Sequence, residues 1–284
     1  MNYFLGIMLF LLPCALWGQL PRVQENPNPP VELTFHAPRH INLMTVEPIA
    51  KKELHFSIMH TFNTIDNGYR NLWGIDNGAN IRLSLEYGIS RRFSIGWGRS
   101  SLDKVFDLYT RYHLLVQTQT NSIPFSVSLM GGAAVNTSNY DFLPQPSVSA
   151  QQRWSYVVQA MLARKFGQRL SLQLNPMLAY FPDIHPIFAL EGTQKTYVAT
   201  AFAAKVGITS RTSLTMQWIP TLNSTLRNNV GVGIDVEAGG HVFQLYLVTS
   251  PALNESYLLA GGNGKVGEKF RIGFNVNRIF ALSR

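Results

Sequence analysis

The side chains of this sequence that could do chemistry are charged residues placed at alternate positions within apolar stretches. Arg82 and Glu86, for example, alternate with Leu83, Leu85 and Tyr87. Because side chains along a strand point to its two faces in turn, such charges share one polar face. Ten candidates follow this pattern: Arg82, Glu86, Asp107, Arg111, His113, Lys165, Lys205, Asp235, Glu237 and Arg271.

Two interpretations of these charges remain open. Opposite charges in a narrow interior pair into a structural network, since a buried unpaired charge is costly. Alternatively, the charges line a path for solutes, and the modest excess of cations then favours anions. Glycines predicted to share the polar face leave room either for a pore or for Tyr109 and Arg111 to pack: Gly96, Gly98, Gly131, Gly231, Gly233 and Gly273.

The histidines show no spacing typical of a metal site. They lack HxH and HExxH patterns and are scattered at positions 36, 40, 55, 60, 113, 185 and 241. A serine nucleophile needs a histidine base within hydrogen-bond reach, oriented by a third group. His60, on a predicted lipid-facing side near the external rim, shows no such partner. We therefore predict no enzymatic activity, no metal and no cofactor.

The polar faces belong to about twelve segments of alternating apolar and polar residues. The predicted strands cover 54–62, 79–90, 92–100, 105–117, 123–135, 153–166, 169–180, 196–208, 212–219, 229–238, 241–249 and 269–280. Short connections such as Gly239-Gly240 alternate with long ones such as Asn63 to Gly78 and Pro251 to Glu268. This alternation is typical of outer-membrane barrels, which have short periplasmic turns and longer external loops. The loops around Asn67, Asn139, Asp183 and Asn263 are therefore predicted to be exposed at the cell surface.

Aromatic side chains sort into two levels. Trp97, Trp154, Tyr180 and Trp218 fall at external strand ends, and Tyr87, Phe93 and Phe280 at periplasmic ends. Two girdles at two interfaces are expected of a membrane barrel. A soluble β-sandwich or barrel would instead pack its aromatics inward without regard to level.

Composition agrees with a membrane location and suggests partners. Charged residues make up 14% of the chain, fewer than a soluble domain usually carries, and the net charge is +8. Outer-membrane lipid and lipopolysaccharide phosphates are the predicted partners, and small solutes are a further candidate. No basic cluster points to nucleic acid, and nothing indicates an oligomeric state.

The N-terminal region divides into two parts before the barrel. Residues 1–18 read as a signal peptide, with cleavage predicted after Gly18. The chain's one cysteine, Cys14, lies inside it, so the mature chain has no thiol. Residues 19–52 form a Pro-rich periplasmic segment and a candidate plug, in which Val31–Phe35 could add a further strand. The barrel is assigned to 53–284.

Several short stretches resemble a domain-of-unknown-function family of single-chain outer-membrane β-barrels from Bacteroidetes. They are Ile41-Asn42, Thr45-Val46-Glu47, Leu54 to Phe62, Gly74-Ile75-Asp76, Leu85-Glu86-Tyr87-Gly88, Gly98-Arg99-Ser100 and Phe270 to Asn275. Thr61 departs from the resemblance, since a basic residue is expected there. The resemblance implies an outer-membrane barrel and carries no established activity.

The sequence thus predicts an all-β fold, an antiparallel transmembrane β-barrel of about twelve strands in the outer membrane of a Gram-negative-type bacterium. Three functions fit such a barrel. The leading one is a narrow channel or solute-interacting barrel. The alternatives are a non-conducting structural or partner-binding barrel and a lipid-active enzyme, which a buried Ser–His contact at the rim would favour.

Overall fold

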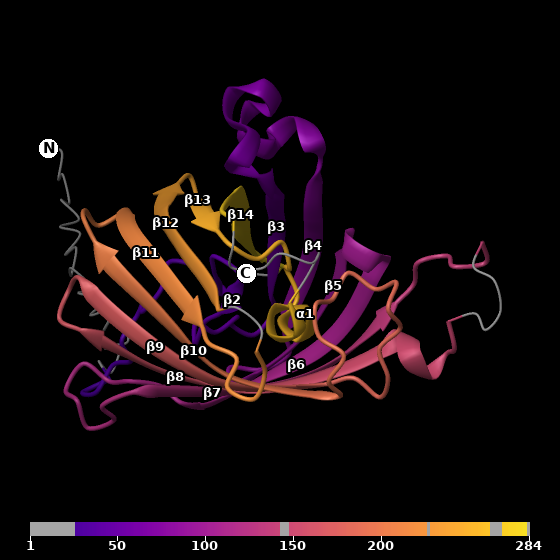
Figure 1. Ribbon diagram of the computed structural model, residues 1–284. Helices are drawn as coiled ribbons and strands as arrows, with labels where there is room; N and C mark the ends of the chain where they lie inside the picture. The colour runs from indigo at the N-terminus through magenta and orange to yellow at the C-terminus, as the bar shows by residue number, and fades with distance from the viewer. Residues whose placement is uncertain (1–25, 143–147, 226–227, 262–268, 283–284) are drawn as a thin grey trace, which may run out of the picture.

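The computed structural model describes residues 26–142, 148–225, 228–261 and 269–282. Twelve antiparallel strands of this part form a closed barrel, in which sequential strands pair and β14 closes onto β3 (Figure 1). The strands are β3 (Glu53–Thr64), β4 (Ala79–Gly88), β5 (Phe93–Ser100), β6 (Val105–Leu115), β7 (Ser126–Asn136), β8 (Trp154–Phe166), β9 (Leu170–Tyr180), β10 (Thr196–Gly207), β11 (Thr212–Ile219), β12 (Asn229–Ala238), β13 (His241–Val248) and β14 (Arg271–Ala281).

These strands confirm the predicted fold class and lie within a few residues of the predicted bounds. Val31–Phe35 forms no strand, and its neighbourhood makes only an isolated bridge between Pro30 and Thr118. The predicted signal peptide and the cleavage after Gly18 lie outside the described residues. None of the helices in the described ranges is long and apolar enough to cross a bilayer.

The two faces of the wall differ as the alternation predicts. Leu83 is 45% exposed on the outside, whereas Arg82 beside it is fully buried. The girdle residues Trp97, Trp154, Tyr180 and Trp218 are exposed on the outer wall. One predicted face is wrong: Gly131 lies outward, because its neighbours Met130 and Gly132 point into the barrel. A Cβ on Gly131 would meet only a side-chain methyl of Val158, whereas one on Gly132 would meet Tyr109.

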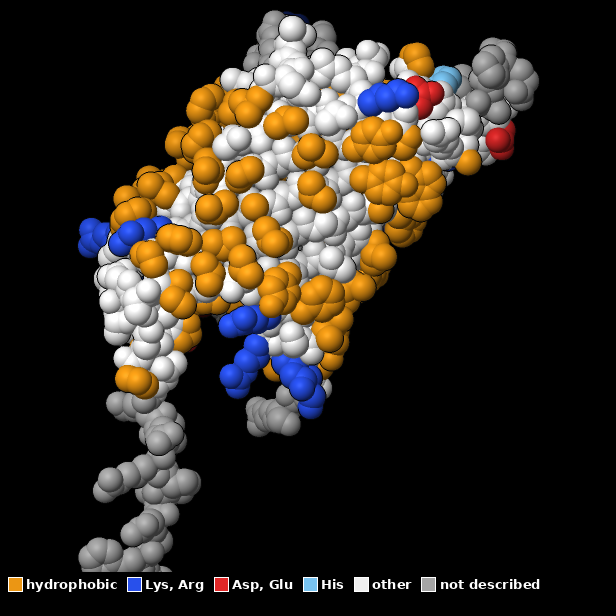
Figure 2. All heavy atoms as spheres, turned by 90° about the horizontal axis from the view of Figure 1, so that it is seen from below, with side chains coloured by type: hydrophobic (Ala, Val, Ile, Leu, Met, Phe, Trp, Pro, Cys, Tyr) orange, Lys and Arg blue, Asp and Glu red, His pale blue; other side chains and the backbone are white. Residues whose placement is uncertain are grey.

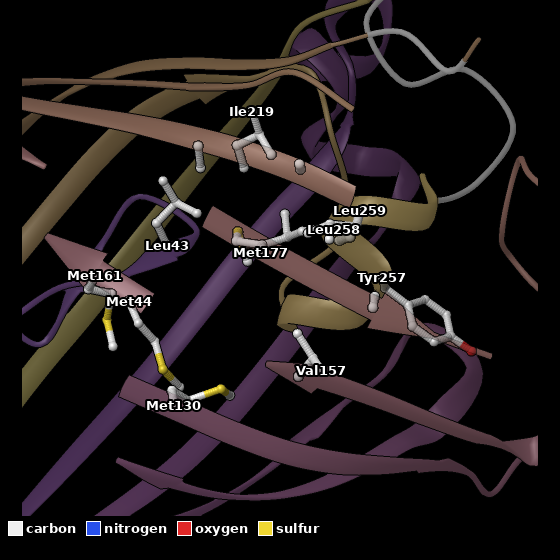
Figure 3. Packing of buried hydrophobic residues seen from close by; sticks show 14 of the residues in the cluster. Leu43, Met44, Met130, Val157, Met161, Met177, Ile219, Tyr257, Leu258 and Leu259 are labelled. Atoms are coloured by element: carbon white, nitrogen blue, oxygen red, sulfur yellow. The ribbon is translucent and has the colours of Figure 1, made fainter. Parts of the chain in front are cut away.

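The N-terminal segment lies inside the barrel. It contains β1 (Arg39–His40) and β2 (Leu43–Met44), which pair with each other, and residues 37–46 are all buried. Leu43 and Met44 pack in one apolar cluster with Met130, Met161 and other inward side chains of β7–β10 (Figure 3). Unbranched methionine side chains adapt to irregular gaps, so this side of the interior is apolar and can pack against the irregular backbone of the N-terminal segment.

A second segment enters from the external end. The connection between β13 and β14 folds inward and carries α1 (Glu255–Ala260), whose N-terminus is capped by the Asn254 side chain accepting from Tyr257 N at 2.9 Å. Residues 250–261 are buried, and Figure 1 shows α1 inside the barrel. The loop around Asn263 is predicted to be exposed, and Asn263 itself lies outside the described residues; the first half of this connection, residues 251–261, is buried. Its apolar Leu258 and Leu259 join the cluster around Met177.

In the described residues, three of the other external connections carry 3-10 segments: η1 (Ile65–Asn77), η2 (Leu102–Lys104) and η3 (Gln151–Arg153). The hairpin of β3 and β4 that bears η1 projects well beyond the neighbouring strands (Figure 1). Lys269 forms an ion pair with Asp66 at the base of η1.

Candidate functional site: the filled lumen

The lumen wall pairs several of its predicted charges. Arg82 on β4 reaches across β5 to Asp107 on β6, with Nη2 donating to Oδ1 at 2.7 Å. Arg111 on β6 reaches back to Glu86 on β4, and its Nη2 lies 2.7 Å from Oε1. All four are nearly or fully shielded from solvent, at 9% exposure or less. This half of the lumen is therefore a paired network rather than a row of free charges.

Glycines make these crossings possible. A Cβ on Gly98 would lie 2.3 Å from the Arg82 guanidinium, and one on Gly96 would lie 2.3 Å from the Tyr109 ring. On β14, a Cβ on Gly273 would overlap the Tyr246 ring of β13 at 2.2 Å. The space that the inward glycines leave is thus filled by large side chains and does not form a pore.

Buried amides of the barrel wall hold the N-terminal segment through its backbone. Gln244 Nε2 donates to Arg39 O at 3.0 Å, and Asn275 Nδ2 donates to Ile41 O at 2.7 Å. Gln217 Oε1 accepts from Asn42 N at 3.1 Å. Gln173 makes two contacts, donating to Met44 O at 2.8 Å and accepting from Val46 N at 2.9 Å. These contacts replace a strand ladder with side-chain hydrogen bonds.

The two inserted segments also contact each other. Arg39 forms an ion pair with Glu255 of α1, and both side chains are 2% exposed. Asn42 Nδ2 donates to Ala252 O at 3.1 Å, and Asn80 on β4 donates to Pro251 O at 2.7 Å. The lumen is consequently closed by one continuous assembly of both segments.

Asp103 fastens α1 at the external mouth. Its Oδ2 accepts from Tyr257 Oη at 3.0 Å and from Ala189 N, in the β9–β10 connection, at 2.9 Å. Burial raises the pKa of the Asp103 carboxyl above its usual range, although these two hydrogen bonds oppose the shift. The contact thus joins three external connections and responds to protonation.

Two lysines fasten the N-terminal segment at the periplasmic end. Lys165 Nζ donates to Glu32 O and Lys205 Nζ donates to Leu33 O, each at 2.8 Å. Burial, aided by the nearby charges of these two lysines, lowers the pKa of His36 to about 4, so His36 is neutral at physiological pH. Glu47 accepts from Phe35 N at 2.9 Å.

All ten residues singled out from the sequence occupy inward-facing strand positions. Besides the pairs and lysines above, Asp235 accepts from Gln244 at 3.1 Å and His113 Nδ1 lies 2.7 Å from Ser128 Oγ. Glu237 lies at the periplasmic end of β12 and Arg271 at the external start of β14. Their role in a solute path stays a prediction.

Sequence reasoning missed the amides and Arg39, Glu47 and Glu255. The amides could have been found, because they occupy inward-facing polar positions of the strands.

Two Ser–His contacts exist inside the barrel, at His113 with Ser128 and at His36 with Ser213, the latter at 3.3 Å. Within the described ranges, the second ring nitrogen of each histidine has no hydrogen-bond partner. A catalytic histidine is normally oriented by a carboxylate or amide at that nitrogen. The described residues also contain no group of three or more metal-ligating side chains.

Comparisons with known proteins identify the family of this chain and the solved structures that share its fold. A family described as "Membrane bound beta barrel domain (DUF5777)" matches residues 35–280, which include the inserted N-terminal segment. The KdgM porin in complex with disordered oligogalacturonate has a TM-score of 0.50 and 8% identity, over 80% of this chain and 99% of that chain. The COG4313 outer membrane channel from Pseudomonas putida F1 has a TM-score of 0.51 and 15% identity, over 82% and 97%.

A variant of outer membrane phospholipase A from Escherichia coli is similar at a TM-score of 0.47 and 10% identity, over 81% of this chain and 91% of that chain. This likeness is too weak to carry an argument about chemistry. At the identities of the two channels, similarity shows the barrel fold alone. No curated protein matches the sequence.

Proposed function

This chain belongs to the DUF5777 family of membrane-bound β-barrel domains, and from that premise we propose that it is an outer-membrane solute channel closed at rest by its two inserted segments. One observation carries the proposal. From residue 34 to residue 47, the N-terminal segment is held by side chains such as Gln173 and Gln217 and not by backbone pairing with the barrel strands. Its departure would leave all twelve strand pairings of the described barrel intact.

The chemistry of the wall supports a wet interior once the segments move. Buried amides such as Gln217, Gln244 and Asn275 can exchange a backbone partner for water at little cost, because water offers equivalent hydrogen bonds. Lys165 and Lys205 would lose the carbonyls of residues 32 and 33 and face the lumen. The paired Arg82 and Arg111 would contribute little net charge. The open channel would thus prefer small anionic solutes weakly.

Conductance of the full mature chain in planar bilayers tests the proposal. The unmodified protein should be closed most of the time at low voltage. Asn42→Ala, which removes the contact with Ala252, and Arg39→Ala should each raise the open probability. The exchange Arg39→Glu with Glu255→Arg should restore closure, since it rebuilds the ion pair.

Two outcomes would contradict the channel. If no variant conducts, although each shows the heat-modifiable gel mobility of a folded barrel, the protein is a non-conducting barrel. A large, steady conductance from the unmodified protein would show that the inserted segments do not close the lumen. Heat-modifiable mobility is the control because a folded barrel migrates differently before and after boiling.

One surface feature favours the alternative of a partner-binding barrel. The projecting β3–β4 hairpin exposes Tyr69 at 75%, Leu72 at 50% and Trp73 at 49%. Leu72 and Trp73 hold left-handed backbone conformations, with φ of 46° and 51°, which cost energy for non-glycine residues. A photo-crosslinker at position 73 should give a discrete adduct on intact cells if this function holds, whereas one at exposed Leu222 should not.

An enzymatic role has less support. The acyl or phosphate ester bond of a lipid would have to reach a Ser–His contact inside the barrel, where Ser128, Ser213 and His113 are buried. The unmodified protein and the variants Ser128→Ala and Ser213→Ala should therefore all hydrolyse lipid no faster than a buffer blank, and hydrolysis by the unmodified protein that either variant loses would contradict this expectation.

A further inference from the structure

The outer wall carries an apolar groove of about 660 Å³ that crosses β6 to β10. Small outward residues form its floor, among them Gly131, Ala160 and Pro176. Larger side chains flank it, including Leu129, which is 44% exposed, and Leu178, which is 39% exposed. The groove therefore results from small residues at neighbouring positions of adjacent strands.

The strand ladder is interrupted beneath this groove. Pairing of β8 with β9 runs to Gln159 opposite Met177 and resumes, in the same register, at Leu162 opposite Leu174. Pro176 lies in the gap, and proline has no N–H to donate to a ladder. A proline in the middle of a membrane strand destabilises the strand ladder, because it removes a hydrogen bond. At this position it also helps to form the groove on the outer wall.

A polar pocket of about 540 Å³ lies at the periplasmic end of the same strand. It is lined by Arg164 and Lys165 together with Glu32, the one acid among its described lining residues. Arg164 faces outward four residues after Ala160, which corresponds to about 13 Å along a strand. Its guanidinium lies over the Phe166 ring, 5.1 Å from the centroid, where the ring limits its motion.

The surroundings of the two sites define the kind of molecule that fits both. Figure 2 looks onto this wall: hydrophobic side chains cover it, and most of the visible Lys and Arg side chains gather toward one end. The visible Asp and Glu side chains lie at the opposite end. A molecule that fills both sites must have an apolar part in the groove at Ala160 and an anionic group at Arg164. Arg164 lies about 13 Å further along the strand, at the level of the periplasmic headgroups.

We propose that this wall binds one anionic phospholipid of the periplasmic leaflet, with its phosphate at Arg164 and an acyl chain in the groove over Ala160 and Pro176. The apolar groove supplies shape, since a concave wall contacts a chain on more sides than a flat one does. The outward-facing guanidinium of Arg164, at the edge of the polar pocket, supplies the preference for a negative headgroup. A second copy of this barrel would fit poorly, because it would present a convex wall without a phosphate.

Native mass spectrometry of the full mature chain in detergent tests the site. The probes are phosphatidylglycerol and phosphatidylcholine with the same acyl chains, and the water-soluble headgroup glycerophosphoglycerol. The unmodified protein should retain one phosphatidylglycerol in preference to phosphatidylcholine. Ala160→Leu should weaken both lipids about tenfold, whereas Arg164→Gln should weaken phosphatidylglycerol about tenfold and leave phosphatidylcholine nearly unchanged.

Matched controls lie elsewhere on the wall. Ala204→Leu adds the same bulk to β10 outside the groove, and Arg211→Gln removes a cation from another periplasmic turn; both should bind lipid as the unmodified protein does. Unchanged binding by Ala160→Leu and Arg164→Gln would overturn the proposal. So would equal affinity for the soluble headgroup, or a dimer lost on Ala160→Leu without loss of lipid. Heat-modifiable mobility verifies that each variant is folded.

Discussion

Arg39 and Glu255 form a buried ion pair inside the barrel, although 216 residues separate them in the chain. Arg39 belongs to the N-terminal segment, and Glu255 begins a helix of the β13–β14 connection. This ion pair and the hydrogen bond from Asn42 to Ala252 O join segments that enter from opposite ends, so movement of one segment weakens the contacts that hold the other. Opening is therefore expected to be a coupled event, in which the loss of either partner frees both segments.

The wall pair of Arg82 and Asp107 should behave differently from this pair. Arg82→Ala leaves a partly buried carboxylate without its cation, so we expect a loss of about 3–5 kcal/mol in unfolding free energy, measured by urea titration in lipid. The same substitution should not raise the open probability, because the hydrogen bonds of the Arg82 side chain in the described structure go to Asp107 and not to either inserted segment.

A double replacement provides the control. Arg82→Met with Asp107→Leu removes both charges and keeps comparable volume, so most of the lost stability should return. If the double variant is as unstable as Arg82→Ala, the loss comes from packing against Gly98 rather than from the stranded carboxylate.

The barrel could be predicted closely from the sequence because its cause is local. Alternation along Leu83, Leu85 and Tyr87 fixes which face meets lipid, and turn length fixes which end is periplasmic. The wrong face of Gly131 has a physical origin. Gly131 and Gly132 are adjacent and lack side chains, so neither supplies the polarity that sets the alternation.

The filled lumen could be predicted only in part because its contacts are distant in sequence. Alternation placed Arg82, Glu86 and Lys205 inward, but no local pattern shows that Glu255 meets Arg39 or that Gln217 meets Asn42. The first half of the β13–β14 connection is buried, although long loops are usually exposed. Its apolar run of Leu258, Leu259 and Ala260 was the signal for burial.

Acidification should favour the closed channel through Asp103. Burial raises its pKa while α1 is docked, and outward movement of the loop would return the carboxyl to an ordinary pKa near 3.8. The closed state thus binds a proton more tightly, so open probability should fall as pH drops through the raised pKa and rise as pH increases. Tyr140 and Tyr257, the other ionisable groups that face Asp103, remain neutral in this range.

Asp103→Asn is the matching variant, because it keeps the shape and cannot ionise. Its open probability should no longer vary with pH between neutral and about 4, the ordinary range of a carboxyl. A pH dependence that survives in Asp103→Asn would assign the response to another group.

Lys205 should set part of the charge preference of the open state. In the closed structure its ammonium donates to Leu33 O, and no wall carboxylate forms an ion pair with it among the described residues. Lys205→Gln should lower the ratio of anion to cation permeability, seen as a shift of reversal potential in a salt gradient. Arg211→Gln, in an exposed turn, should leave the ratio unchanged; equal shifts would mean a general surface-charge effect.

The orientation of the barrel can be tested by cysteine labelling, since the single cysteine of the sequence, Cys14, lies within the predicted signal peptide. Cysteines at Asn139 and Asp183, in long connections, should react with a membrane-impermeant maleimide on intact cells. A cysteine at Gly240 should react only after the outer membrane is permeabilised. Labelling of position 240 alone on intact cells would reverse the orientation.

Depth on the lipid face should decide how much an added charge costs. Leu83 and Ile89 are both 45% exposed on the outer surface, but Leu83 lies in the middle of β4 and Ile89 follows its periplasmic end. Leu83→Arg should destabilise the inserted barrel by roughly 2–4 kcal/mol, because a guanidinium at the bilayer midplane loses its hydration. Ile89→Arg should cost only about 0–1 kcal/mol, since its guanidinium reaches the headgroups. Reversible unfolding from vesicles measures both variants, and equal losses would show that β4 does not span the hydrocarbon as its alternation indicates.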